Sequence, residues 1–243
     1  MKFTEPNLLN TSGGSKAFAL NRRDLIKFGA AGALAITALG CKKYVISDAA
    51  QTENNPGNRI DFAAPNDIGL LNYLYALEQL EAAFYLKVCE SFPADFTDLQ
   101  KTYFNELKLH EQTHVAYFAS IIGNQAAIGQ LDFDLSSVNF SSKISVLATA
   151  QSFEDLGVAA YNGALEKTNL VSSIITFSQI ATVEARHAGW VRNQVVTRSS
   201  VSLDQLTSLG ANATQATDVS LPPAMVLQQV MKYIKTKLEI LNA

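Results

Sequence analysis

Apolar residues recur every three or four positions in four successive segments between residues 66 and 198, and this spacing is typical of one face of an α-helix. The first three segments are preceded by side chains that commonly cap helices: Asn66 or Asp67, Asp95 or Thr97, and Ser141 or Ser142. Gly123 is expected to end the second helix, and a break at 167–169 separates the third from the fourth. Strand-like alternation is sparse, so the sequence predicts an all-α fold.

The lengths of these segments favour a four-helix bundle. Helices of about 25 residues are about 37 Å long, which is the usual length in such bundles. The connections within the first pair and within the second pair are short, so each pair is expected to form an antiparallel hairpin. The stretch 123–140 is long enough to cross the bundle. After a loop at 199–221, Pro222 and Pro223 are expected to open an additional C-terminal helix that packs on the bundle, within 199–243.

Acidic residues and histidines interrupt all four apolar stripes. The stripes are Leu71, Leu74, Glu78, Glu81 and Tyr85; Phe104, Leu107, Glu111, His114, Phe118 and Ile121; Leu147, Ala150, Glu154, Gly157, Tyr161 and Leu165; and Phe177, Ile180, Glu184, His187 and Val191. Unpaired carboxylates in a core are costly, and no lysine or arginine falls clearly on these stripes. Two divalent metal ions would balance four carboxylates. Oxygen-rich ligation with one imidazole per metal favours iron or manganese over zinc or copper.

An internal repeat supports a site with two similar halves. The sequence EQLEAAFY at 78–85 aligns with EDLGVAAY at 154–161, and EQTH at 111–114 aligns with EARH at 184–187. Within each Glu-x-x-His motif the two side chains leave the same face of a helix. Each half therefore supplies one glutamate, one tyrosine and one Glu-x-x-His motif.

This arrangement resembles the ferritin-like diiron carboxylate proteins, in which two helices each give one glutamate and two give Glu-x-x-His. It is most similar to the bacterial ferritin-like domain family that also contains plant desiccation-related proteins. The resemblance covers about 66–198 and implies a ferritin-like four-helix bundle. It implies that Glu111 and Glu184 bridge two metal ions. The remaining ligands would be Glu78 and His114 on one ion, and Glu154 and His187 on the other.

The resemblance also implies partners for the ligands. A tyrosine two turns after each glutamate typically donates a hydrogen bond to a ligand of the opposite pair, so Tyr85 is expected to contact Glu154 and Tyr161 to contact Glu78. Glu81 fits the same stripe as Glu78. Because its counterpart in the repeat is Gly157, we favour Glu78 as the ligand and Glu81 as an additional carboxylate beside the site.

The other reactive or polar residues are interpreted as structural. His110 points about 100° away from Glu111 on a helix and has Val183 as its repeat counterpart, so it is expected at the surface rather than on a metal. Cys89 is expected to be a buried thiol. The remaining tyrosines of the helices are interpreted as packing residues, one of which could help electron transfer: Tyr73, Tyr75, Tyr103 and Tyr117.

The first part of the chain reads as an export signal. Arg22 and Arg23 precede a short apolar run that ends before Gly40, which resembles a twin-arginine signal. The sequence ALGC at 38–41 resembles a bacterial lipobox and makes Cys41 the expected lipidation site; ordinary cleavage after Gly40 is the alternative. Residues 1–41 are therefore expected to be the signal and 42–65 a flexible tether. This predicts a protein of the periplasm or cell envelope, anchored to a membrane by its lipid.

The charge of the chain argues against a nucleic-acid-binding function. The net charge of −3 gives no basic surface for nucleic acid. By resemblance, two iron or manganese ions would react with dioxygen or peroxide, as in a ferroxidase or oxidase. A manganese catalase-like disproportionation of peroxide is one alternative. A stress-protective or adaptor bundle without turnover is another, and an N-terminal tether argues against a ferritin-type storage cage.

Overall fold

The computed structural model describes residues 57–124 and 126–243. The expected export signal, Cys41 and most of the expected tether lie outside these residues.

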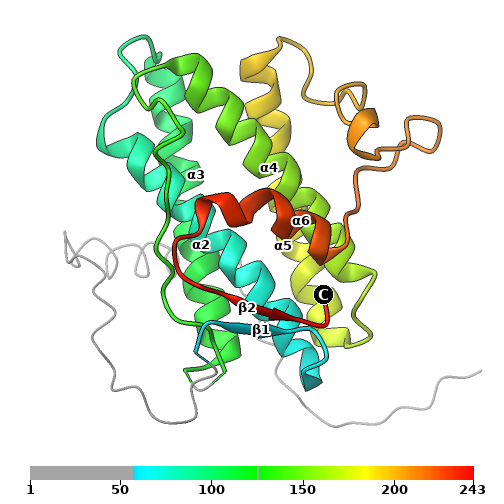
Figure 1. The fold of residues 1–243 in the computed structure, drawn as a ribbon. Coiled ribbons are helices and arrows are strands. Elements are labelled where there is room, and N and C mark those ends of the chain that lie inside the picture. The colour runs from blue at the N-terminus through cyan, green and yellow to red at the C-terminus, as the bar shows by residue number, and fades with distance from the viewer. Residues whose placement is uncertain (1–56, 125) are drawn as a thin grey trace, which may run out of the picture. The chain divides into compact units, whose positions relative to one another are not determined.

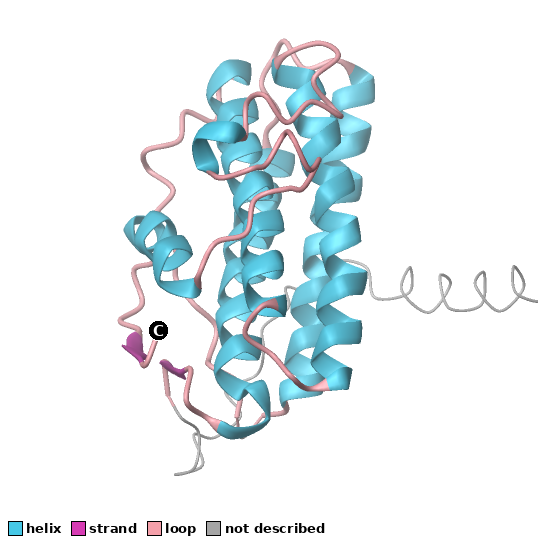
Figure 2. Cartoon of the chain, turned by 90° about the vertical axis from the view of Figure 1, so that its right-hand side faces the viewer, coloured by secondary structure: helices cyan, strands magenta, loops and turns pink. Residues whose placement is uncertain are grey.

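Four long helices form the body of the protein: α2 (Ile68–Glu90), α3 (Asp98–Ile122), α4 (Lys143–Leu165) and α5 (Val171–Val195). α2 packs along α3 and α4 packs along α5, while α2 also contacts α4. Figures 1 and 2 show the four helices side by side, with the connection between α3 and α4 running along the bundle. The predicted all-α bundle with two hairpins and a long crossover is confirmed.

α3 and α4 begin with the predicted capping side chains, whereas α2 does not. Thr97 begins α3 with a capping box, in which its side chain accepts a hydrogen bond from the amide of Gln100 and the Gln100 side chain accepts one from the amide of Thr97. The Ser142 hydroxyl caps α4. Asp67 occupies the N-cap position of α2, but its side chain accepts a hydrogen bond from Thr168 in the α4–α5 loop instead of capping the helix. Gly123 ends α3 with a φ of 78°, which favours glycine.

The expected C-terminal helix is present, but it is short. α6 (Pro223–Val230) is followed by the 3-10 turn η3 (Met231–Tyr233), and the helix ends there. The backbone beyond it bonds to the crossover, because the amide of Asp134 donates to Tyr233 and the amide of Lys235 donates to Asp132. Met225 on α6 is half exposed.

A short parallel pair of strands joins the two ends of the described chain. β1 (Arg59–Asp61) pairs with β2 (Glu239–Leu241), with Ile60 opposite Ile240. The last part of the segment expected to be a flexible tether is therefore held by the C-terminus. Two further 3-10 turns complete the described elements, η1 (Pro65–Asp67) and η2 (Thr207–Leu209).

Packing on the α2–α4 side positions α6. Leu221, just before α6, donates its amide hydrogen to the carbonyl of Ala159. Gly163 permits this approach, since a Cβ atom there would lie 1.8 Å from the carbonyl oxygen of Leu221. α6 consequently crosses the α2–α4 side of the bundle (Figure 1). None of the helices in the described part of the chain is both long and apolar enough to cross a bilayer.

One detail of the predicted core is wrong. Ile121 was expected on the buried stripe of α3, but it is 42% exposed, and Ile122 is the buried residue. The stripe drifts by one position over the length of α3 because an α-helix has 3.6 residues per turn rather than a whole number.

Candidate metal centre

The structure brings the six predicted ligands together in the middle of the bundle. They form two groups, and in each group one ligand atom per residue lies within 4.8 Å of the others: Glu78, Glu111, His114 and Glu184; and Glu111, Glu154, Glu184 and His187. Each of the four long helices contributes at least one residue. Glu111 and Glu184 belong to both groups, so each lies where a carboxylate could bridge two ions.

Both imidazoles turn the same nitrogen toward the carboxylates. Nδ1 of His114 lies 3.0 Å from Oε2 of Glu78 and 3.1 Å from Oε2 of Glu111. Nδ1 of His187 lies 3.0 Å from Oε1 of Glu111 and 3.4 Å from Oε2 of Glu154. The two halves of the repeat thus present the same donor atoms to a common centre.

Several of these atoms are buried without a hydrogen bond. Both side-chain oxygens of Glu184, Oε1 of Glu111 and Oε2 of Glu154 have no hydrogen-bond partner. Nδ1 of His187 is near Glu111 but outside hydrogen-bond geometry. Among the described residues, no lysine or arginine forms an ion pair with the clustered glutamates. A cluster of unsatisfied lone pairs with no lysine or arginine beside it is what divalent metal ions would satisfy, so the donor set fits two such ions.

Two tyrosines hold the carboxylates across the repeat. The hydroxyl of Tyr85 on α2 donates to Oε1 of Glu154 on α4, and the hydroxyl of Tyr161 on α4 donates to Oε1 of Glu78 on α2. Both predicted hydrogen bonds are therefore present. Each tyrosine binds one oxygen of its glutamate, and the second oxygen faces the centre, which fixes the orientation of the carboxylate.

The electrostatics of the metal-free centre are those of a crowded acidic cluster. Burial raises the pKa of Glu78 to about 7, and burial together with Glu111 raises the pKa of Glu184 well above its usual value. Burial disfavours the charged imidazoles, but Glu78 and Glu111 raise the pKa of His114 to about 11, and Glu154 and Glu111 raise that of His187 to about 12. In the absence of metal, protons therefore neutralise the cluster.

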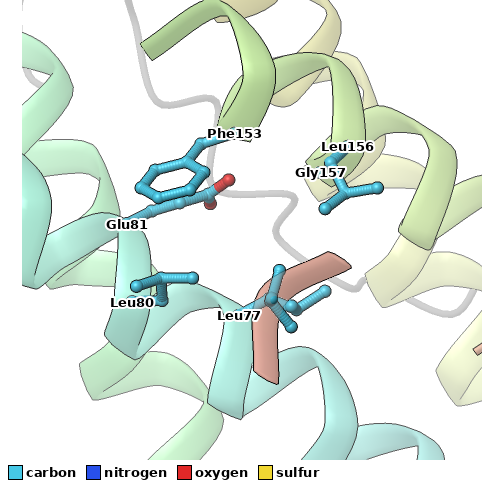
Figure 3. Close-up of a pocket in the computed structure, with 7 residues that line it drawn as sticks. Leu77, Leu80, Glu81, Phe153, Leu156 and Gly157 are labelled. Atoms are coloured by element: carbon cyan, nitrogen blue, oxygen red, sulfur yellow. The ribbon is translucent and has the colours of Figure 1, made fainter. Parts of the chain in front are cut away.

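Glu81 is a fifth buried carboxylate, 5% exposed, at the edge of the cluster. It reaches from α2 toward α4 beside Phe153, and Gly157 lies opposite (Figure 3). Together they border a crevice of about 10 Å³, enough for about one water molecule, whose walls are otherwise apolar. The walls are Leu77 and Leu80 of α2, Phe153 and Leu156 of α4, and Val230 of α6. The crevice therefore has room for a molecule of this size beside the Glu81 carboxylate.

The structure adds a contact that the sequence did not predict. His110 is exposed, as expected, but its Nδ1 lies 2.8 Å from Nε2 of His187, and the two rings stack with centroids 5.0 Å apart. His110 precedes His114 by one helical turn, but the contact with His187 depends on how α3 packs against α5. Cys89 is partly buried, and burial raises the pKa of its thiol to about 11, which disfavours a role as a nucleophile.

Comparison with known proteins agrees with the geometry. A family model described as a ferritin-like domain matches residues 66–197, which is more than half of the chain and includes all six clustered residues. No curated protein matches the sequence. The chain belongs to the ferritin-like domain family.

Proposed function

We propose that this protein holds two divalent iron or manganese ions between its four long helices and uses them in redox chemistry with dioxygen or peroxide. The observation that carries the proposal is the buried group of four carboxylates and two Nδ1 atoms, which contains unsatisfied oxygens and no protein cation other than the two imidazoles. A bundle that needed only packing would be more stable with apolar residues at these positions.

Each residue has a defined task in this proposal. Glu111 and Glu184 would bridge, Glu78 and His114 would complete one metal position, and Glu154 and His187 would complete the other. Tyr85 and Tyr161 hold the carboxylates in place. Glu81 would add a fifth carboxylate on the side of the crevice.

When bound, two iron or manganese ions would supply the electrons that reduce dioxygen or peroxide, as in the oxidation of Fe(II). The protein contributes burial, because the four ligand glutamates are almost fully excluded from solvent. It also contributes selection by size, because the crevice beside Glu81 has room for about one water-sized molecule. Such a site suits a small oxidant better than an organic substrate.

The N-terminal sequence motifs concern the location of the protein in the cell. We propose export through the twin-arginine route and lipidation of Cys41, which would anchor the protein in the cell envelope. Support comes from the sequence alone, in the paired arginines and the ALGC motif. Incorporation of a clickable palmitate analogue into the wild type, and its loss in Cys41→Ser, is the expected result. Equal labelling of both proteins would exclude Cys41.

The metal content of the purified full chain tests the central proposal. Expressed in iron- and manganese-supplemented medium, it should contain about two of these ions per chain by elemental mass spectrometry, and Glu154→Ala and Glu184→Ala should each abolish dinuclear binding. Glu90→Gln, an exposed change on α2, is the control. If both variants, Glu154→Ala and Glu184→Ala, still bind two ions, the assignment of the metal ligands is wrong. No metal after anaerobic reconstitution would identify a bundle that has kept its ligands without binding metal.

A further inference from the structure

A chain of aromatic rings connects the centre with the protein surface. Tyr85 on α2 contacts Phe104 on α3 with ring centroids 5.5 Å apart, and Phe104 contacts Trp190 on α5 at 6.1 Å. Trp190 then stacks on Tyr103 at 4.5 Å with an interplanar angle of 23°. The inner ring, Tyr85, is fully buried, whereas Tyr103 is 41% exposed. Four rings from three helices thus lead from the core to solvent.

The inner end of this chain touches the candidate metal centre directly, because the hydroxyl of Tyr85 donates a hydrogen bond to Glu154. The rings also differ in their chemistry. Phenol and indole side chains can lose one electron under biological conditions, whereas a phenyl ring cannot. Tyr85, Trp190 and Tyr103 can therefore each be oxidised to a radical by the loss of one electron. Phe104 fills the space between Tyr85 and Trp190. Trp190 is the only tryptophan in the chain.

The other half of the repeat provides an internal comparison. Tyr161 contacts Phe118 at 6.5 Å, and Phe118 contacts Tyr117 at 6.2 Å, with Tyr117 40% exposed. This path also reaches solvent, but the distances between its ring centroids are longer, and only a phenylalanine lies between its two tyrosines. Electron tunnelling slows steeply with distance, so electron transfer is faster along the path through Trp190. The difference between the two halves points to a task for the Trp190 path beyond packing.

We propose that Tyr103, Trp190 and Tyr85 form the route by which single electrons enter the metal centre from a small hydroquinone-type reductant outside the protein. This inference rests on the proposed function. Tyr103 is exposed and stacks on the partly buried Trp190, so the Tyr103 ring offers a flat aromatic surface on which such a reductant can lie.

The electrons and protons balance along this route. The hydroquinone gives up one electron to the route and one proton to water. When a tyrosine or tryptophan of the route gives an electron to the group on its inner side, it becomes a radical, and the next redox-active ring toward the surface reduces it. A tyrosine loses its phenolic proton together with its electron and regains both on reduction. The net change in each step is the oxidation of the reductant by one electron and the reduction of the centre by one electron. With two iron or manganese ions bound, two such steps would supply the electrons needed to return both to the reduced state.

Flash photo-oxidation of the metal-free full chain tests the inner half of the route. A ruthenium(III) polypyridyl oxidant generated by a laser flash will oxidise Trp190, whose radical has a distinctive optical spectrum. In Tyr103→Phe, the tryptophan radical is expected to decay into a tyrosine radical, and this product should disappear in Tyr103→Phe/Tyr85→Phe. A tyrosine radical that persists in the double variant, or that never forms in Tyr103→Phe, would overturn the proposed connection. Circular dichroism of each variant verifies folding.

Reduction of the metal-loaded protein tests the entry point. After oxidation by peroxide, re-reduction by 1,4-hydroquinone is followed by the optical absorption of the centre. Trp190→Phe and Tyr103→Phe are expected to slow this reduction at least tenfold without changing the metal content, whereas Tyr117→Phe on the other path should leave it unchanged. Equal rates in all four proteins would overturn the route. If the protein holds no metal, the proposed function fails separately, and the photo-oxidation result still decides whether the rings conduct.

Discussion

Gly157 on α4 stands opposite Glu81 on α2, and a Cβ atom at Gly157 would lie 3.2 Å from Oε1 of Glu81. The two residues occupy equivalent positions in the internal repeat, so one half provides a carboxylate where the other provides space. The same missing side chain makes room for Glu184, whose Oε2 would lie 3.0 Å from that Cβ atom. The asymmetry between the two halves thus places a fifth carboxylate beside one of the shared glutamates.

Gly157→Ala is expected to weaken metal binding by about 10- to 100-fold, because the added methyl group must displace the carboxylates of Glu81 and Glu184. The helix itself should tolerate the change, since alanine favours helices over glycine by about 0.5–1 kcal/mol. Titration with a competing chelator measures the affinity. Ser152→Ala, an exposed change on the same helix, is the control. An affinity equal to that of the wild type would mean that the space at Gly157 does not matter to the centre.

Glu81→Gln is expected to act with opposite signs in the two states of the protein. Burial and the neighbouring Glu184 raise the pKa of Glu81 well above its usual value near 4.5. Because the pKa of Glu81 is raised in the folded state, its contribution to the free energy of unfolding is fully present below about pH 4.5 and is lost as the pH rises through the folded-state pKa. Removing this acid should therefore stabilise the metal-free protein at pH 7, by about 1–3 kcal/mol, and have little effect near pH 4.5.

In the metal-loaded protein the same change removes a negative charge beside the ions, so it should weaken metal binding. Thermal melting of both states at pH 4.5 and 7 distinguishes these effects. A glutamine variant that destabilises the metal-free protein at pH 7 would show that Glu81 has a stabilising partner that the geometry does not reveal.

The sequence predicted the bundle and the six clustered residues because both depend on local periodicity. Glu111 and His114 share a helical face whatever the rest of the chain does, and a buried acidic face restricts which helices can meet. The pairing of β1 with β2 was not predictable in this way. Three-residue strands carry almost no pattern, and Ile60 and Ile240 are brought together only after the bundle has formed. The His110–His187 contact likewise depends on how α3 and α5 pack, which no single helix encodes.

Metal binding is expected to release at least two protons per chain near pH 7. Both imidazoles hold a proton in the metal-free centre, with pKa values raised to about 11 for His114 and about 12 for His187, and a metal ion can bind only the neutral ring. Affinity should consequently rise with pH. Calorimetric titration with Mn(II) in buffers of different ionisation enthalpy counts the protons. Binding without proton release would contradict protonated imidazoles in the metal-free state.

The same raised values predict how the metal-free protein responds to alkali. A histidine whose pKa is raised on folding contributes stability that is complete below its unfolded value of about 6.5 and is lost as the pH approaches the folded value. The metal-free protein should therefore unfold at lower temperature at pH 10 than at pH 7. Metal should reduce this difference, because bound ions replace the protons. The measurement is the melting temperature at both pH values with and without Mn(II).

Tyr85→Phe and Tyr161→Phe are each expected to reduce metal affinity by about 10- to 100-fold, because each removes the hydroxyl that orients one glutamate. Because the two bonds are related by the repeat, the losses should be similar in size. Tyr75→Phe, a change at a buried tyrosine outside the cluster, is the control for loss of a hydroxyl from the core. If Tyr85→Phe and Tyr161→Phe bind metal as tightly as this control does, the hydrogen bonds do not orient the carboxylates.

His110→Val is expected to weaken the metal position that contains His187 and to leave the position that contains His114 intact. When Nδ1 of His187 binds a metal ion, its proton resides on Nε2 and can be donated to Nδ1 of His110, 2.8 Å away, which fixes the orientation of the ring. Valine occupies the equivalent place in the repeat, as Val183, and cannot accept such a bond. The variant thus makes the two halves alike. A metal titration that resolves two binding steps should show one step weakened by about tenfold; two steps weakened equally would mean that His110 acts on the whole bundle rather than through His187.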